Sequence, residues 1–274
     1  MQALITQFDQ IISFATQMGL PSHKKRGIIR EYLQTKFIHD LYAHREADQL
    51  VFVGGTSLRL LRNIPRFSED LDFDNLGLRP EQIHVLLENI TARWNRENLA
   101  VELVTNRQKA AWYAELRFPR LLSELKISTN PKEKLRIKVD YGNWWRGQKP
   151  EQVLCNRFGL IQQVVTNPLN QILVQKLTAY VRRPQTQARD LYDVVWLFAQ
   201  GARLDQDFTQ VNRLKGIGGG VEVDLLTAAR TKLASEGVTD VFRRRLQPFL
   251  FDEAEVAKID LFGRVLSELV EIGS

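Results

Sequence analysis

The residues best suited to chemistry begin at residue 52 of this 274-residue chain. The apolar pair Phe52-Val53 is followed by Gly54 and Gly55, and then by the hydroxyl side chains of Thr56 and Ser57. A strand that ends in two glycines lets the backbone approach a ligand closely, because no side chain obstructs it. If a helix begins at this point, its unpaired backbone N–H groups favour a phosphate. We therefore expect this turn to bind a nucleotide.

Two carboxylates follow the turn at a spacing that suits a metal ion. Asp70 and Asp72 lie in a segment whose residues 71–74 alternate apolar and polar, as in a half-buried strand. Side chains two apart on a strand leave the same face, and adjacent carboxylates are costly unless water or a cation neutralises them. Oxygen-only ligands suit Mg²⁺ or Mn²⁺ held together with nucleotide phosphates. Either motif alone is typical of an ordinary turn or a solvated strand face, but together they indicate a nucleotide–metal site.

Composition and charge narrow the class of protein. The chain is 44% hydrophobic and 26% charged, which is ordinary for a globular protein and excludes a disordered or collagen-like one. The single cysteine, Cys155, excludes an internal disulfide framework and a Cys-rich zinc site. Neither a signal peptide nor a run of 18 apolar residues occurs, so we expect a cytoplasmic protein with no membrane span. The net charge of +6 admits a polyanionic partner such as RNA.

Hydrophobic periodicity predicts the elements that position these side chains. The expected elements are helices at 5–15, 24–44, 56–61 and 80–97, strands at 50–53, 71–74, 101–105, 112–118 and 135–141, and helices at 168–183, 189–200, 223–235, 238–249 and 253–271. Because strands and helices do not alternate regularly, an α+β fold fits better than a doubly wound sheet. We expect an α+β module with N-terminal helices over residues 1–165 and a helical module over 166–274. The glycine-rich run at 216–220 is expected to be a connecting loop.

The ordered motifs resemble those of a known family. Residues 54–58 (Gly-Gly-Thr-Ser-Leu) and 67–73 (Phe-Ser-Glu-Asp-Leu-Asp-Phe) look like the AbiEii-type nucleotidyltransferase toxins, which include the MenT-like toxins. That family belongs to the DNA polymerase β-like superfamily. Its later signature is a lysine on a helix and then a basic-Asp-x-Tyr-Asp segment, which Lys176 and residues 189–193 match. The resemblance implies a polymerase β-like mixed sheet with N-terminal helices and a C-terminal helical module.

The resemblance also implies a catalytic metal centre. Asp70 and Asp72 would hold the metal, Mg²⁺ or Mn²⁺, while Gly54, Gly55 and the two hydroxyl residues after them would surround the triphosphate of an NTP. Polymerase β-like enzymes usually supply a third carboxylate from a later strand. Asp140 is our candidate because its neighbours alternate correctly for a strand, with an ordinary outward-facing charge as the alternative reading.

The later signature implies further site residues. Lys176 would meet a nucleotide phosphate as a point charge, with a solvated helix position as the alternative. Asp193 resembles the family aspartate assigned to the active site. Asp190 shares its helix face and could instead pair locally with Arg189 or Arg183. A structural role, in which this motif ties the helical module to the catalytic one, also remains open.

Together these expectations define a function. We expect a metal-dependent nucleotidyltransferase that moves NMP from an NTP to an acceptor, and the resemblance implies that this acceptor is RNA, at the 3′ end of a tRNA. The same resemblance implies that it acts as the toxin of a toxin–antitoxin system, blocks translation, and has a cognate antitoxin encoded nearby. The basic clusters at 24–26, 182–183 and 243–245 could contact RNA or could be solvated helix faces. The alternatives are a non-catalytic nucleotide- or RNA-binding member of the fold and, last, a metal-dependent nuclease.

Overall fold

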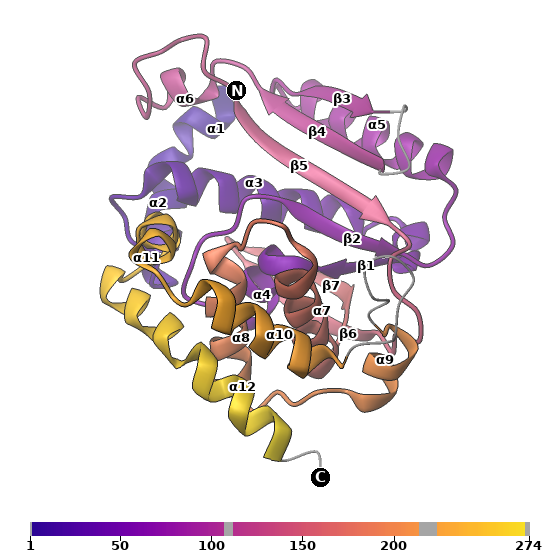
Figure 1. The fold of residues 1–274 in the computed structure, drawn as a ribbon. Coiled ribbons are helices and arrows are strands. Elements are labelled where there is room, and N and C mark those ends of the chain that lie inside the picture. The colour runs from indigo at the N-terminus through magenta and orange to yellow at the C-terminus, as the bar shows by residue number, and fades with distance from the viewer. Residues whose placement is uncertain (1, 107–111, 214–223, 272–274) are drawn as a thin grey trace. The chain divides into compact units, whose positions relative to one another are not determined.

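The computed structural model describes residues 2–106, 112–213 and 224–271. Figure 1 shows the helices and strands of the chain. The chain divides into two compact units. The first comprises Met1–Asn63, Phe67–Trp144 and Gln152–Thr166, and the second comprises Ile64–Arg66, Trp145–Glu151 and Asn167–Ser274. Short segments of the second unit therefore interrupt the first along the sequence. The expected loop at 216–220 lies outside the described residues.

The first unit is built on a mixed sheet. Its strands are β1 (Leu50–Val53), β2 (Leu71–Asn75), β3 (Glu102–Asn106), β4 (Trp112–Phe118), β5 (Leu135–Gly142), β6 (Glu151–Arg157) and β7 (Leu160–Thr166). They follow the order β3-β4-β5-β2-β1-β7-β6. β1 pairs antiparallel with β2 and parallel with β7, while β2 runs parallel to β5. β4 pairs antiparallel with both β3 and β5. The expected α+β class is confirmed.

Helices accompany this sheet. In the first unit they are α1 (Gln2–Thr6), α2 (Phe8–Gln17), α3 (Lys25–Leu41), the 3-10 helix Arg45–Gln49, α4 (Gly54–Arg62), α5 (Pro80–Arg96) and α6 (Leu121–Glu124). α3 and α5 contact each other, and they also contact strands of the sheet, α3 reaching β5 and β7 and α5 reaching β3. The Phe37 ring of α3 lies 6.4 Å from that of Phe73 on β2, which stacks on Phe52 of β1 at 5.2 Å. The core of the unit therefore lies between these two helices and the sheet.

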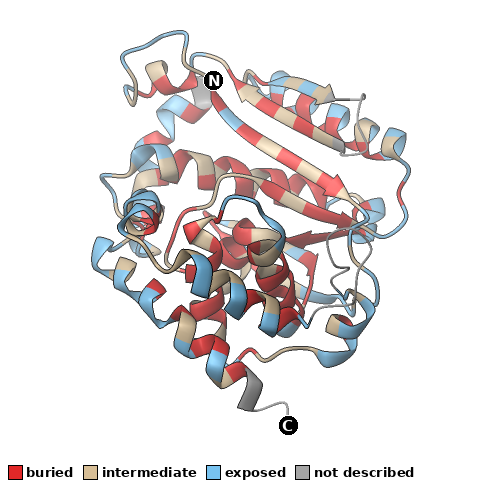
Figure 2. Cartoon of the chain, viewed as in Figure 1, coloured by how far each residue is buried: buried red, intermediate tan, exposed pale blue. Residues whose placement is uncertain are grey.

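Strand β5 shows how the sequence separates the two faces of the sheet. Its apolar residues Leu135, Ile137, Val139 and Tyr141 are buried, and the residues between them are half-buried or exposed (Figure 2). Successive side chains of a strand point to opposite faces. On β2, Asp72 therefore points away from the face on which its neighbour Phe73 enters the core.

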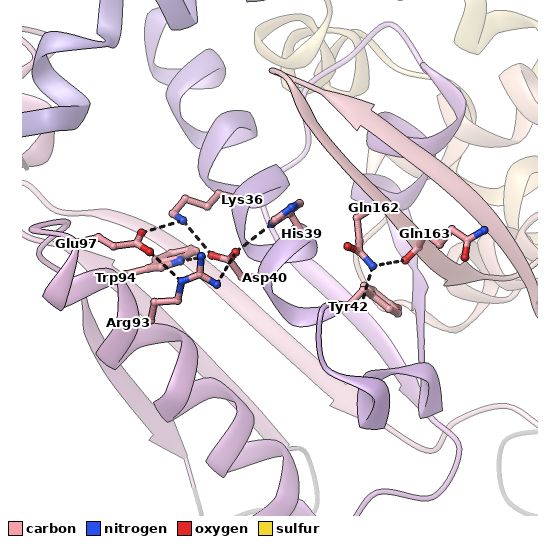
Figure 3. Close-up of polar contacts among 9 residues, drawn as sticks. All are labelled: Lys36, His39, Asp40, Tyr42, Arg93, Trp94, Glu97, Gln162 and Gln163. Atoms are coloured by element: carbon pink, nitrogen blue, oxygen red, sulfur yellow. Dashed lines mark hydrogen bonds and ion pairs between the residues drawn. The ribbon is translucent and has the colours of Figure 1, made fainter.

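A buried carboxylate joins α3 and α5 (Figure 3). Asp40 of α3 accepts a hydrogen bond of 2.6 Å from Trp94 Nε1 of α5 and one of 3.0 Å from Lys36 Nζ. The Arg93 guanidinium lies 3.5 Å and His39 Nδ1 3.1 Å from the same carboxylate. Because buried charge must be paired to be tolerated, this network fixes how the two helices meet.

The sequence patterns predicted no strands at residues 151–166, where the structure has the hairpin of β6 and β7. Its two connecting residues, Phe158 and Gly159, have φ values of 52° and 76°. Positive φ at both central positions is what a two-residue hairpin turn of type I′ requires. Thr166 Oγ1 of β7 then donates a 2.6 Å hydrogen bond to the Phe52 carbonyl, which ties the hairpin to β1.

The second unit is helical, as expected. It contains α7 (Leu169–Arg182), α8 (Ala188–Ala199), α9 (Gln206–Val211), α10 (Leu225–Glu236), α11 (Asp240–Leu246), the 3-10 helices Gln247–Phe249 and Glu253–Leu261, and α12 (Phe262–Glu271). The expected single helix at 253–271 is thus 3-10 over its first half. α7 packs on α8, and the Tyr180 ring of α7 meets Phe262 of α12 edge-on at 4.9 Å. Among the described residues, no helix has both the length and the apolar character that a bilayer crossing needs.

Candidate active site

The turn between β1 and α4 holds a carboxylate against its backbone. α4 begins at Gly54, directly after Val53 ends β1, and Val53 is the register partner of Asp72 on β2. Gly54 has φ +78°, and a Cβ placed on it would meet Asp72 Oδ2 at 2.1 Å. Only glycine therefore permits both the left-handed backbone and the close approach of this carboxylate.

The two hydroxyls of the turn are used within the protein. Ser57 Oγ donates a 2.9 Å hydrogen bond to the Gly54 carbonyl, and Thr56 Oγ1 donates to the Asp70 carbonyl. Both side chains are buried. The Thr56 bond links the start of α4 to the segment that carries Asp70. Any phosphate bound here would thus meet the backbone N–H groups of the first turn of α4, including that of Gly55, since these lack partners within the helix.

Two neighbouring strands carry the three candidate metal-binding carboxylates, one of them on the residue just before its strand. Asp72 of β2 and Asp140 of β5 are register partners in parallel strands. Asp70 lies one residue before β2, which begins at Leu71 as expected. Asp140 lies within β5, as its alternating neighbours predicted, and its side chain is partly exposed.

Lys138 is a charged residue at this cluster to which the sequence reasoning gave no role. Its Nζ lies 2.7 Å from Asp140 Oδ1 and 4.9 Å from the centre of the Tyr113 ring. Burial alone would lower the pKa of Lys138, but its hydrogen bond to Asp140 and the charges of Asp140, Asp70 and Asp72 raise it above its ordinary value. The one signal in the sequence was its position, two residues before Asp140 on the polar face of β5.

The three carboxylates are oxygen ligands of the kind that a hard metal ion prefers, but they do not by themselves form a complete metal site. Among the described residues, no three His, Cys, Asp or Glu side chains are grouped closely enough to hold a metal ion. The carboxylates of Asp70, Asp72 and Asp140 supply only oxygen ligands, which suit Mg²⁺, an ion that keeps several waters and shares substrate phosphates. The Asp72 carboxylate lies against the bare backbone of Gly54.

The second unit carries the later motif as a buried ion-pair network. Asp193 of α8 is fully buried and receives two 2.6 Å hydrogen bonds from Arg66, one from Nε and one from Nη2. Lys176 Nζ of α7 lies 2.8 Å from Asp193 and 3.4 Å from Asp190. Asp190 also pairs with Arg183, in agreement with the local pairing that the sequence left open. One lysine is therefore held by two carboxylates, and one of these is itself clamped by an arginine.

Two cationic side chains stabilise the ionised form of the Asp193 carboxyl. Burial alone would raise the pKa of its carboxyl, yet the charges and hydrogen bonds of Arg66 and Lys176 hold that pKa below its ordinary value. With its carboxylate enclosed in this way, Asp193 can orient Lys176 but is not exposed to a substrate. The sequence reasoning gave no role to Arg66, whose partner lies 127 residues further along the chain.

The basic clusters proposed from the sequence are partly neutralised. Each contains an arginine in an ion pair: Arg26 with Glu133, Arg183 with Asp190, and Arg243 with both Asp240 and Asp260. These charges are therefore shared with protein carboxylates rather than wholly available to a polyanion.

Comparisons with known proteins concern the family and the fold of the chain. No curated protein sequence matches the chain significantly. The solved structure of MenT4, a nucleotidyltransferase toxin of Mycobacterium tuberculosis H37Rv, is similar with a TM-score of 0.55 at 15% identity, covering 96% of this chain and 90% of that one. JHP933 of Helicobacter pylori is similar with a TM-score of 0.51 at 18% identity, covering 90% of this chain and 94% of that one. At such identities the likeness concerns the fold.

A match of the sequence to a protein-family model identifies the family of the chain. The model of the family described as the nucleotidyl transferase AbiEii toxin of type IV toxin–antitoxin systems matches residues 37–266. That range contains the glycine turn, the three carboxylates of the sheet, and the Lys176 network. The chain therefore belongs to the AbiEii nucleotidyltransferase toxin family, as the resemblance of its motifs predicted.

Proposed function

We propose that this protein transfers a nucleoside monophosphate from an NTP to the 3′ end of a tRNA in the cytoplasm. The observation that supports this most directly is the close approach of Asp72 to Gly54, with Asp140 in register beside it. This arrangement sets a carboxylate oxygen next to the N-terminus of α4, whose first backbone N–H groups lack partners within the helix. A triphosphate and a divalent cation are the chemical pair that such neighbours accommodate together.

Each part of the proposal has its residues. Asp70, Asp72 and Asp140 would hold Mg²⁺ or Mn²⁺, which when bound would neutralise charge on the triphosphate and on the attacking oxygen. The residues from Gly54 to Ser57 would surround the triphosphate. Lys176, oriented by Asp193, would meet a phosphate of the nucleotide as a point charge.

The proposed reaction is a displacement at the α-phosphorus of the NTP. The acceptor hydroxyl forms a new O–P bond, the bond between the α-phosphorus and the bridging oxygen breaks, and pyrophosphate leaves with that electron pair. The hydroxyl proton passes to a carboxylate or to water. Such transfers depend on positioning and charge neutralisation more than on covalent chemistry by the protein.

We propose a division of labour along the chain. Residues 1–165 would carry the metal and nucleotide chemistry, and residues 166–274 would supply Lys176. Extending the tRNA 3′ end would prevent its use in translation, which would make the protein toxic. The family, defined by type IV toxin–antitoxin systems, implies an antitoxin partner, and we propose that it is encoded nearby.

The test uses the full chain with each NTP in turn, Mg²⁺ or Mn²⁺, and bulk tRNA. Label at the α-phosphate should enter RNA, whereas label at the γ-phosphate should appear in pyrophosphate. Periodate-oxidised tRNA, which lacks the 3′ diol, should accept nothing. Asp70→Ala and Asp72→Ala should each abolish transfer while keeping the circular dichroism spectrum of the wild type, and Asp9→Ala, at an exposed position in α2, should retain it.

Other outcomes would point elsewhere. NTP binding without transfer to any RNA would favour the non-catalytic alternative, and shortening of unlabelled RNA would favour a nuclease. Transfer to periodate-oxidised tRNA would exclude the 3′ end as the acceptor. Retention of transfer by Asp70→Ala and Asp72→Ala would contradict the proposed metal centre.

A further inference from the structure

Lys138 lies on the same face of the sheet as the candidate metal-binding carboxylates. Leu71 pairs with Val139 and Asp72 with Asp140 in the parallel ladder of β2 and β5. Asp70 is the residue before Leu71, and Lys138 is the residue before Val139, the partner of Leu71. Because side chains two apart on a strand share a face, Lys138 projects on the side of Asp140.

The contacts of Lys138 hold its ammonium group at these carboxylates. Its Nζ is 2.7 Å from Asp140 Oδ1, an ion-pair distance. It also lies 4.9 Å from the centre of the ring of Tyr113, the register partner of Asp140 on β4, where an aromatic face attracts a cation. The charges of Asp70 and Asp72 act on the same ammonium group.

An ammonium group and a divalent cation compete for the same oxygen atoms. Both are hard cations that neutralise carboxylates, and three carboxylates near one lysine leave a net charge of about −2 for a metal to neutralise. In the described part of the chain no three acidic, His or Cys side chains are gathered as a finished metal site, while one of the three candidate carboxylates is already paired with Lys138.

We propose that Lys138 is a resident cation of this carboxylate group, which a divalent metal must displace from Asp140 in order to bind. The inference rests on the proposed metal centre and adds a residue that sets its affinity. Lys138 keeps the carboxylates together when no metal is bound, and it weakens the binding of metal in the absence of nucleotide. It is thus a positioning residue for the reaction rather than a ligand.

The test measures metal affinity directly, without turnover. Mn²⁺ is titrated into the full chain without NTP and followed by the electron paramagnetic resonance signal of free Mn²⁺. Lys138→Met keeps the apolar stem and removes the charge, and we expect it to bind Mn²⁺ about tenfold more tightly or better, because one competing charge is lost. The Lys138 side chain is 43% exposed, so this variant should fold. Lys134→Met is the matched control, since Lys134 precedes the same strand but pairs with Glu102 instead, and it should bind Mn²⁺ like the wild type.

A second readout separates this role from a merely structural one. Without metal, Lys138→Met should have a lower Tm than the wild type, because three carboxylates then repel one another. Added Mn²⁺ should raise its Tm by more than it raises that of the wild type. Equal or weaker Mn²⁺ affinity in Lys138→Met, with binding intact in the wild type, would overturn this inference alone. If neither protein binds Mn²⁺, the metal centre of the proposed function falls as well.

Discussion

The Asp72 carboxylate lies so close to Gly54 that a Cβ on that glycine would meet Asp72 Oδ2 at 2.1 Å. The first residue of α4 thus has two requirements that only glycine meets, a φ of +78° and an empty side-chain position. Gly19 matches one of them, with φ +77°, but has nothing within 4 Å of its missing Cβ. Substituting these two glycines by alanine therefore distinguishes two effects: backbone strain, which occurs at both positions, and displacement of a carboxylate, which occurs only at Gly54.

Gly54→Ala should therefore lower the rate of NTP transfer more than Gly19→Ala does. A left-handed alanine costs about 1–2 kcal/mol at either position. At Gly54 the new methyl group must also push Asp72 aside, and misplacement of a reacting group by about 1 Å lowers a rate roughly 100-fold. We expect Gly19→Ala to keep wild-type NTP transfer with a slightly lowered Tm. Similar transfer rates for the two alanine variants would mean that Asp72 does not need its present place.

The Arg66–Asp193–Lys176 network predicts a large loss of stability from a small change. Asp193→Asn keeps the shape of the side chain but leaves Arg66 and Lys176 without the carboxylate that they share. Breaking a buried pair by removing one partner costs about 3–5 kcal/mol. We expect a loss of this size in the free energy of unfolding measured by urea denaturation. Because Lys176 also loses its orientation, the KM for NTP should rise.

The control for this change is an exposed ion pair of the same unit. Arg264 Nε lies 2.7 Å from Glu268 on α12, with most of the arginine side chain in solvent. Since exposed pairs contribute about 0–1 kcal/mol, Glu268→Gln should leave stability and KM almost unchanged. An equally small effect of Asp193→Asn would contradict the role that we give to the buried network.

Elements whose sequence carries a period were predictable. In β5 the alternation of Leu135, Ile137, Val139 and Tyr141 with polar residues sets both the strand and its buried face. The glycine turn and the Asp-x-Asp segment were predictable for a related reason, since each is a short stretch whose chemistry is local. The strand that carries Asp72 begins at Leu71 as expected but ends one residue later, at Asn75, because pairing with Leu50 in the ladder with β1 extends it.

Features that depend on distant partners were not predictable. The turn of the β6–β7 hairpin consists of Phe158 and Gly159, and Phe158 has a φ of 52°. Phe-Gly is not the Asn-Gly or Asp-Gly signature by which such turns are predicted. That Phe158 ring meets Tyr32 of α3 edge-on at 5.5 Å, a tertiary contact that no local pattern reveals. Likewise Arg66 could be assigned a role only once Asp193 was placed against it.

The Asp40 network of α3 and α5 predicts acid sensitivity. Burial alone would raise the pKa of the Asp40 carboxyl, but hydrogen bonds from Trp94, His39 and Lys36 lower it below 3.8, its ordinary value. A carboxyl with a depressed pKa in the folded state stabilises the protein at pH values above its unfolded pKa. That stability is lost as pH falls through the folded-state pKa.

Asp40→Asn should accordingly remove part of the dependence of stability on pH. At pH 7 we expect the variant to be less stable by about 1.5–3 kcal/mol, the worth of hydrogen bonds to a charged group. The gap between wild type and variant in urea denaturation should narrow as pH falls below about 4, because the Asp40 carboxyl takes up its proton first in the unfolded chain and only at lower pH in the folded protein. Asp48→Asn, at an exposed position, should leave the curve unchanged. A gap that stays constant from pH 7 to pH 3 would rule out this linkage.

Cys155 provides a probe of opening in the first unit. Burial raises the pKa of its thiol to about 11, an effect that the nearby charge of Arg157 reduces and that of Glu31 increases. Only a thiolate reacts rapidly with a disulfide reagent, so at pH 8 the folded protein should react with Ellman's reagent far more slowly than the urea-unfolded chain. Because the chain has a single cysteine, the whole signal belongs to this residue.

The same probe tests the charge network that surrounds Cys155. Glu31 lies 2.9 Å from Arg59 Nε and 3.1 Å from Arg157 Nη1, so one buried carboxylate serves two arginines. Glu31→Gln leaves both guanidinium groups without that charge, a change that costs about 3–5 kcal/mol in a buried setting. Opening of the unit becomes more frequent by the same free energy, and labelling of Cys155 at pH 8 should accelerate by at least 100-fold. Glu46→Gln, at an exposed position, should label like the wild type. If Glu31→Gln also labels like the wild type, the network does not hold the first unit closed around this strand.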